Sequence, residues 1–195
     1  MAVPNTHEGP ARIGAVMDGV RSRGGSVYCI GIGGVMMASL AILTARAGFP
    51  VSGSDRAFAG GCDSPTAQRL TAAGIRLFGD HAAAHLPPDC GAVIYTVAIA
   101  EDNPEYRAAA ERGIPRFSRA DYIGWLMTGY SRRVGVAGMH GKSTCTSMCA
   151  QVFLDAAADP TVLIGADYPP IGGAFRLGGR EIFLFEACEY MDSFL

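Results

Sequence analysis

The chain has 195 residues, of which 49% are hydrophobic and 17% are charged, and it carries a formal net charge of -2. This composition supplies enough apolar side chains for one large domain or two modest ones. No apolar run approaches the ~20 residues that a membrane span needs, and the N-terminus lacks the apolar core of a secretion signal. The net charge provides no basic surface for nucleic acid. We therefore expect a cytoplasmic globular protein that binds any anionic ligand in a local site. Its oligomeric state is not predicted by the sequence.

The pattern of apolar residues divides the chain into three parts. Residues 1–25 show little periodicity apart from a possible short helix around Arg12 to Val20, so we expect a poorly ordered leader. Residues 26–130 alternate between strand-like and helix-like segments. The polar stretch Thr128 to Arg133 then marks a boundary, after which residues 131–195 form a second unit.

The alternation within residues 26–130 predicts an α/β fold with a Rossmann-like parallel sheet. In such a sheet the ligand crevice lies at the carboxyl ends of the strands. The expected strands are the apolar run from Val27, Val51–Asp55, Ile75–Phe78, Ala92–Thr96 and Ile114–Phe117, and the expected helices are 35–48, Ser64–Ala73, Pro104–Arg112 and Ser118–Met127.

A glycine turn follows the first expected strand. Gly31 and Gly33 occupy the first two positions of the dinucleotide pattern G-x-G-x-x-G, and Gly34 follows, but Met36 stands where the third glycine belongs. Asp55 ends the second strand, 22 residues after Gly33, where an acid of such a fold contacts a ribose. The glycines could instead serve only the turn.

Two further polar residues lie at expected strand ends. Ser54 precedes Asp55, and His81 follows the third strand. Both could contact a ligand in the crevice, although a loop histidine is as often merely solvated.

A second glycine loop, residues 138–144, follows an expected strand at Arg133–Ala137. It contains Lys142, the only lysine in the chain. A lysine ammonium is compact enough to reach phosphate oxygens within a tight loop. The loop is followed by a helix that we expect to end at Asp159-Pro160. Strand, loop and helix N-terminus together predict a phosphate-binding site, although Val136 stands where the general pattern has its first glycine. The alternative is a simple helix start.

The cysteines occupy positions 29, 62, 90, 145, 149 and 188. They form no C-x-x-C pair and lie mostly in apolar segments, so we expect reduced core residues. Cys145 and Cys149 share a helix face and could hold a metal, but the sequence supplies no histidine pair beside them.

Near the end of the chain, the apolar strand "EIFLFE" ends at Glu186. A carboxylate at the tip of a buried strand beside a phosphate loop is a common ligand for Mg²⁺. The alternative is a solvated strand end.

Four segments together resemble the Mur ligases, from about Val27 to Leu195. They are "YCIGIGGVMMASLAILTARAGFPVSGSD", "AIAEDNPEYRAAAERGIPRFSRADYIGWLM", "VGVAGMHGKSTCTSMCAQVFLDAAADPTVLIGA" and "FEACEYMDSFL". The resemblance implies a first domain, residues 26–130, that binds the UDP part of UDP-N-acetylmuramate. It also implies that residues 131–195 are the start of an incomplete P-loop domain that binds ATP.

The resemblance also assigns roles to individual residues. It implies that UDP-N-acetylmuramate lies near Gly31, Gly33, Gly34, Ser54, Asp55 and His81. It implies that the ATP phosphates are bound by Gly138, Met139, His140, Gly141, Lys142, Ser143 and Thr144, with Lys142 and Glu186 catalytic and with Ser143 and Glu186 holding Mg²⁺. Met36 and Val97 depart from the family's usual glycine and serine.

The activity implied by the resemblance is the ATP-dependent joining of L-alanine to the lactyl carboxylate of UDP-N-acetylmuramate through an acyl phosphate, in peptidoglycan synthesis. Family members continue well beyond the position of Leu195, so we expect this chain to be inactive by itself. Two alternatives remain open: a related ligase that recycles murein peptides, and a Rossmann-type regulatory module that binds a nucleotide without chemistry.

Overall fold

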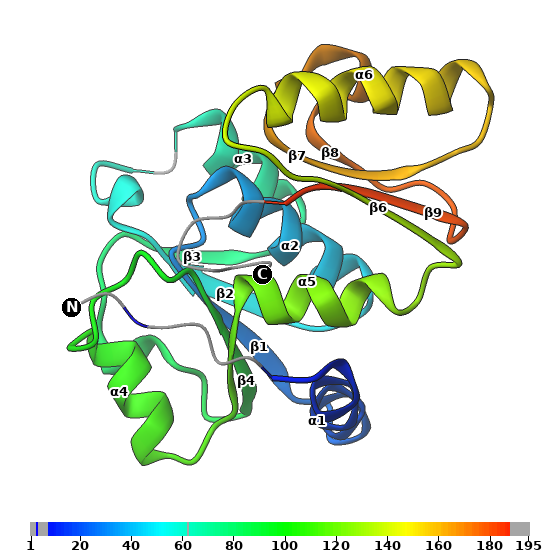
Figure 1. The fold of residues 1–195 in the computed structure, drawn as a ribbon. Helices are drawn as coiled ribbons and strands as arrows, with labels where there is room; N and C mark the ends of the chain where they lie inside the picture. Colours follow the sequence, from blue (N-terminus) through cyan, green and yellow to red (C-terminus); the bar gives the residue numbers. More distant parts are fainter. Residues whose placement is uncertain (1–2, 4–7, 62, 188–195) are drawn as a thin grey trace.

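The computed structural model describes residue 3 and residues 8–61 and 63–187, which form an α/β structure with two sheets (Figure 1). The first sheet is entirely parallel, with the strand order β3-β2-β1-β4-β5. Its central strands β1 and β4 are buried almost throughout, as expected for a parallel sheet that helices cover on both faces. The strands are β1 (Ser26–Ile30), β2 (Val51–Ser54), β3 (Arg76–Phe78), β4 (Cys90–Tyr95) and β5 (Arg116–Ser118).

The connecting helices begin where the sequence predicts. Ser64 caps α3, Asn103 caps α4 and Ser118 caps α5, each by accepting a hydrogen bond from a backbone N–H of the first turn. Pro65 and Pro104 occupy the first positions of α3 and α4, where a missing N–H costs nothing. The helices of this unit are α2 (Val35–Arg46), α3 (Pro65–Ala72), α4 (Pro104–Glu111) and α5 (Arg119–Met127), with 3₁₀ turns at Arg56–Phe58 and Ala83–His85.

The leader differs from our expectation. Residues 10–22 form a regular helix, α1 (Pro10–Ser22), which packs against α5 and β4. Its buried residues Ile13, Met17 and Val20 recur at intervals of three and four, which is the spacing of one helix face. The expectation of a poorly ordered leader therefore does not hold for this segment, because three apolar side chains are enough to attach it to the core.

The second sheet has the order β6-β9-β7-β8, in which only the β7–β8 pair is antiparallel. Helix α6 covers one face of this sheet. The helix ends at Asp155 rather than continuing to the predicted stop at Asp159-Pro160, and the chain turns with positive φ at Ala157 and Asp159. The elements are β6 (Arg132–Val136), α6 (Lys142–Asp155), β7 (Thr161–Tyr168), a 3₁₀ turn at Pro169–Ile171, β8 (Gly173–Arg176) and β9 (Ile182–Glu186).

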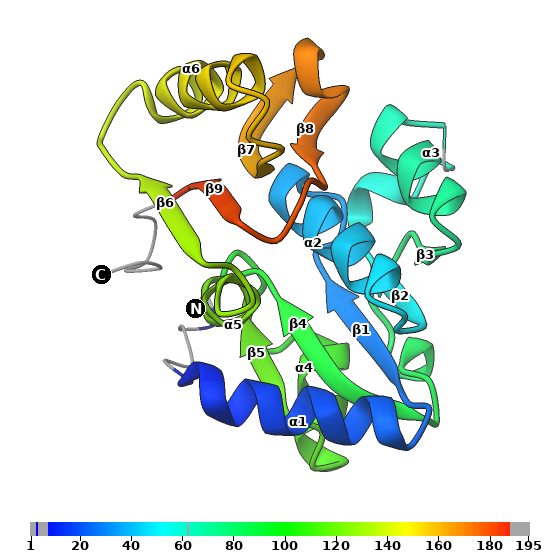
Figure 2. The same cartoon turned by 90° about the vertical axis from the view of Figure 1, so that its right-hand side faces the viewer.

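Helix α2 lies between the two sheets, as Figure 2 shows. It contacts β2 of the first sheet and β7 and β8 of the second. Leu40 of α2 belongs to the same buried cluster as Leu163 of β7 and Phe183 of β9. This position explains why α2 is apolar almost all round: both of its sides are covered.

Two of the cysteines fit the prediction of buried core residues, and one does not. Cys29 and Cys90 are buried, whereas Cys145 is exposed on α6 and Cys149 is half-buried. Cys62 and Cys188 lie outside the described residues. Within the described part of the chain, no cluster of three or more metal-ligating side chains is present, and no helix is both long and apolar enough to cross a membrane.

Candidate active site

A cavity of about 510 Å³ lies at the carboxyl ends of the first sheet. This is the edge where parallel α/β sheets bind ligands, and the volume is within the range of small-molecule sites. We call it the nucleotide cavity, after the ligand that the sequence resemblance implies. Its lining comes from the segments that follow β1, β2, β3 and β4 and from the start of α4, namely Gly31, Asp55, Arg56, His81, Thr96, Ala98, Ile99, Ala100, Asp102, Asn103 and Pro104.

The glycine loop is tied to the end of β2 through Asp55. The backbone N–H of Gly33 donates to Asp55 Oδ2 over 2.8 Å, and the N–H of Ala57 donates to Oδ1 over 2.9 Å. A side chain at Gly33 would collide with this carboxylate, and one at Gly31 would collide with Thr96. Gly31 also has φ +79°, which favours glycine. Both glycines are therefore needed for close approach.

Helix α2 begins at this loop with Gly34 at its N-cap and with no side-chain cap. No side chain of the described residues caps its first N–H groups, and the helix dipole favours an anion in front of them. The missing third glycine is replaced by Met36, which is partly buried against the core, and Val97 is buried after β4. Both departures from the family pattern are accommodated as apolar packing.

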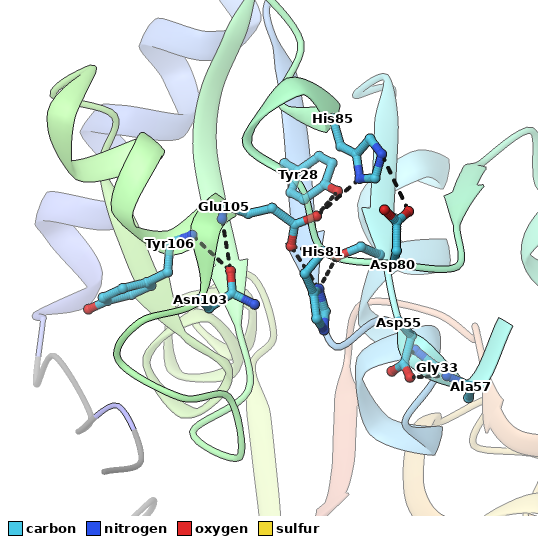
Figure 3. Close-up of polar contacts among 11 residues, drawn as sticks. Tyr28, Gly33, Asp55, Ala57, Asp80, His81, His85, Asn103, Glu105 and Tyr106 are labelled. Carbon is cyan, nitrogen blue, oxygen red and sulfur yellow. Dashed lines mark hydrogen bonds and ion pairs between the residues drawn. The ribbon is translucent and has the colours of Figure 1, made fainter. Parts of the chain in front are cut away.

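Figure 3 shows His81 beside the buried carboxylate of Glu105, which the sequence analysis did not identify. Ser54 contacts the same carboxylate. Glu105, in the first turn of α4, has a fully buried side chain. The Ser54 hydroxyl donates to Glu105 Oε2 over 2.6 Å, and His81 Nδ1 lies 3.0 Å from the same oxygen. The Tyr28 hydroxyl donates to Oε1 over 2.7 Å. Burial raises the pKa of Tyr28, so it remains a neutral donor.

Most cavity residues that the sequence analysis missed come from the segment 98–104. The segment lies in one of the stretches that resemble the Mur ligases, but it is a loop between a strand and a capped helix, and neither its pattern nor the resemblance assigned any of its residues to a ligand. Glu105 follows the Asn103-Pro104 helix start, where an acid normally complements the helix dipole in solvent. Its burial depends on Tyr28 and Ser54 from other strands, which no local pattern reveals.

The second predicted loop joins β6 to α6. Gly138 and Gly141 have φ of +152° and +73°, and the helix begins at Lys142 with no side-chain cap. Lys142 Nζ donates to the carbonyl oxygen of Gly138 over 2.7 Å, so its ammonium lies over the loop. Met139 is 81% exposed. The strand, the loop and the uncapped N-terminus have the geometry of an anion site.

The sheet register brings Glu186 to this loop. Strands β6 and β9 are parallel, and Val136 at the end of β6 pairs with Glu186 at the end of β9. Glu186 Oε2 accepts hydrogen bonds from the Ser143 hydroxyl over 2.9 Å and from the N–H of Gly165 over 2.8 Å. The carboxylate therefore lies beside the residue that follows Lys142, and it is held in place rather than free in solvent.

A hydroxyl and a carboxylate oxygen in contact are hard oxygen donors, which suit Mg²⁺. Ser143 and Glu186 thus fit the metal that the sequence analysis assigned to them, with phosphate oxygens or water expected to supply the other positions. Glu189 and Asp192, which follow in the same sequence motif, lie outside the described residues.

Comparison with known proteins places the chain in a family. The family model described as "Mur ligase family, catalytic domain" matches residues 26–131. The UDP-N-acetylmuramate–L-alanine ligase of Clostridium perfringens (strain 13 / Type A) is 44% identical over 169 residues, which cover 87% of this chain and 36% of that protein. The corresponding ligase of Clostridium botulinum (strain Eklund 17B / Type B) is 40% identical over 178 residues, covering 91% and 37%. The chain thus spans little more than a third of the length of these relatives.

Solved structures show the same likeness. A UDP-N-acetylmuramate:L-alanyl-γ-D-glutamyl-meso-diaminopimelate ligase from Neisseria meningitides matches with a TM-score of 0.75 and 29% identity, over 85% of this chain and 53% of that one. The UDP-N-acetylmuramate-alanine ligase from Thermotoga maritima matches with a TM-score of 0.68 and 26% identity, over 83% and 36%. Since the family model covers more than half of its residues, the chain belongs to the Mur ligase family.

Proposed function

We propose that the protein takes part in the ATP-dependent ligation of L-alanine to the lactyl carboxylate of UDP-N-acetylmuramate, a step of peptidoglycan precursor synthesis. The observation that carries the proposal is the contact between Ser143 and Glu186, which sets a carboxylate beside the lysine-containing loop. The similarity to L-alanine ligases, at 44% identity to one of them, supports the choice of substrates.

In this proposal the nucleotide cavity binds the UDP part of the sugar nucleotide. The uncapped start of α2 faces the diphosphate. Asp55 and His81, which line the cavity, contact the nucleoside. Ser54 Oγ lies 2.9 Å from His81 Nδ1 and helps to orient the ring.

The second loop, residues 138–144, binds the triphosphate. Lys142 neutralises charge on the transferred phosphoryl group, and the N–H groups at the start of α6 hold its oxygens. Ser143 and Glu186 hold Mg²⁺, which when bound offsets the negative charge of the phosphates.

The chemistry follows from the nature of the acid. A carboxylate does not react with an amine, because oxide is not a leaving group. Transfer of the γ-phosphoryl group of ATP to the lactyl carboxylate gives an acyl phosphate and ADP. The amine of L-alanine then attacks the carbonyl carbon, and the tetrahedral intermediate expels phosphate to leave the amide.

A second candidate is the ligation of a recycled murein peptide to the same sugar nucleotide. The likeness to the Neisseria ligase, which has a TM-score of 0.75, favours it. Both candidates use the same two sites of this chain and differ in the amine substrate.

Isothermal titration calorimetry of the 195-residue chain tests the proposal. We expect UDP-N-acetylmuramate to bind and NAD to give no comparable heat. We expect ATP to bind more tightly with Mg²⁺ than without it, and Lys142→Ala to weaken this binding at least tenfold. Tighter binding of NAD than of UDP-N-acetylmuramate would instead favour a Rossmann-type regulatory module.

A further inference from the structure

We propose that Glu105 is a positioning residue of the nucleotide cavity: it holds His81 in the tautomer with hydrogen on Nδ1 and leaves Nε2 to accept a hydrogen bond from the bound nucleoside. The inference rests on the proposed UDP-sugar site and adds a residue and a role to it. Glu105 does not line the cavity, so its action on the ligand is through His81.

Glu105 is a carboxylate with no exposed surface, and such a group is costly to bury unless its oxygens are hydrogen-bonded. Three side chains satisfy it at short distance: Tyr28 at Oε1, and Ser54 and His81 at Oε2. His85 adds a longer contact, with Nδ1 at 3.4 Å from Oε1, and its ring is stacked on Phe78. The donors come from β1, β2 and the segment after β3, so the carboxylate joins several elements of the site.

The contacts among Ser54, His81 and Glu105 define the position of the proton. The Ser54 hydroxyl has one hydrogen, which it donates to Glu105 over 2.6 Å. Ser54 Oγ also lies 2.9 Å from His81 Nδ1, so in that contact it must accept. His81 Nδ1 faces a second acceptor in Glu105 Oε2 at 3.0 Å. Nδ1 therefore carries the hydrogen and shares it between the two oxygens.

The other ring nitrogen is the one that a ligand meets. His81 lines the nucleotide cavity, and its side chain is 13% exposed. In Figure 3 the ring extends away from the carboxylate of Glu105, with Nδ1 on the Glu105 side. A neutral ring with its hydrogen on Nδ1 has a lone pair at Nε2, and this is the form that we propose. The group that it recognises is thus an N–H or O–H of the nucleoside, such as the uracil imide or a ribose hydroxyl.

The start of α4 keeps Glu105 in this position. Asn103 Oδ1 accepts hydrogen bonds from the N–H groups of Glu105 and Tyr106, both over 3.0 Å. Asn103 and Pro104 also line the cavity. The wall of the cavity and the positioning residue are therefore parts of the same capped helix turn.

The first measurement is the ¹⁵N spectrum of the histidine rings of the wild-type chain, with His81 assigned by comparison with a His81→Asn variant. We expect the shifts of a ring protonated at Nδ1. A wild-type His81 that carries its hydrogen on Nε2 would overturn the proposal, whatever the variants do.

Two variants of Glu105 then separate positioning from structural support. Glu105→Leu removes the acceptor, so the Ser54 hydroxyl is free to donate to His81 Nδ1, and we expect the ring hydrogen to move to Nε2. Glu105→Gln is the matched control, because its carbonyl oxygen can still accept from Ser54 and His81 while its amide donates to the Tyr28 oxygen. We expect this variant to keep the Nδ1–H form.

Binding of UDP by calorimetry completes the test. We expect the Kd to rise about tenfold in Glu105→Leu and to change less than threefold in Glu105→Gln. In the His81→Asn background, Glu105→Leu should cause no further loss. Unchanged UDP affinity in a folded Glu105→Leu variant would refute the inference alone, whereas absence of UDP binding by the wild-type chain would refute the proposed nucleotide site itself.

Discussion

Substitution of Gly33 by alanine tests the link between the glycine loop and Asp55. The new Cβ would lie 2.8 Å from Asp55 Cγ and 2.8 Å from Oδ2. Ordinary contacts of a carbon atom begin near 3.5 Å, so the carboxylate must retreat by about 0.7 Å. The hydrogen bond from Gly33 N–H, now 2.8 Å, would then exceed hydrogen-bond length.

A hydrogen bond to a charged group contributes about 1.5–3 kcal/mol when shielded from water. Gly33 and Asp55 are only half-buried, so solvent screening reduces this contribution to about 1–2 kcal/mol. If this contact shapes the bound state, the Kd for UDP rises about tenfold. Calorimetry with UDP measures the affinity, and thermal unfolding without ligand measures the cost to the fold.

Gly34→Ala is the matched control. An alanine Cβ at Gly34 would meet only the carbonyl oxygen of Gly31, at 3.7 Å, which is an ordinary contact. The backbone of Gly34 is extended, so alanine fits there apart from a small N-cap cost. If Gly33→Ala and Gly34→Ala bind UDP equally well, the contact with Asp55 has no part in nucleotide binding and our reasoning about this loop is wrong.

Three further predictions concern the second unit and the thiols. Lys142→Ala should weaken ATP binding at least tenfold by calorimetry, and Lys142→Arg should not restore it, because a planar guanidinium does not fit the tight loop. Gly165→Ala should lower the affinity for Mg²⁺-ATP about tenfold and leave the binding of metal-free ATP unchanged. The reason is that the alanine Cβ would lie 2.8 Å from Glu186 Oε2 and displace the carboxylate from the metal. Equal losses with and without Mg²⁺ would contradict this. Burial raises the pKa of Cys29 to about 12, so at pH 8 a maleimide should modify exposed Cys145 in the folded chain and Cys29 only after unfolding, as mass spectrometry can show.

The sequence predicted those parts of the protein that depend on local patterns. Strand, glycine turn and helix occur together around Gly31, and the same order recurs around Lys142, because a short loop between a parallel strand and its helix needs specific backbone geometry. The position of Glu186 at the end of a buried strand was also predicted. The register of β6 and β9 then accounts for its proximity to Ser143.

Other features depend on residues that are distant in the sequence. Tyr28 and Glu105 are 77 positions apart, and nothing near either one indicates that they form a hydrogen bond. Helix α1 was underestimated because its apolar face has only three buried residues, and its stability comes from packing on α5 and β4. Such contacts follow from the fold and are not visible in a local pattern.

The position of α2 connects the two candidate sites. The helix begins at the glycine loop of the nucleotide cavity, and its flank packs against β7 and β8 of the second sheet. Arg46 near its end lies over the ring of Phe175 in β8, with the guanidinium carbon 5.5 Å from the ring centroid. Strand β7 in turn pairs with β9, which carries Glu186. In the proposed function, a sugar nucleotide at one loop and a triphosphate at the other would therefore be held by elements that share one apolar core. This arrangement would suit a transfer between two bound substrates, in which orientation accounts for much of the rate.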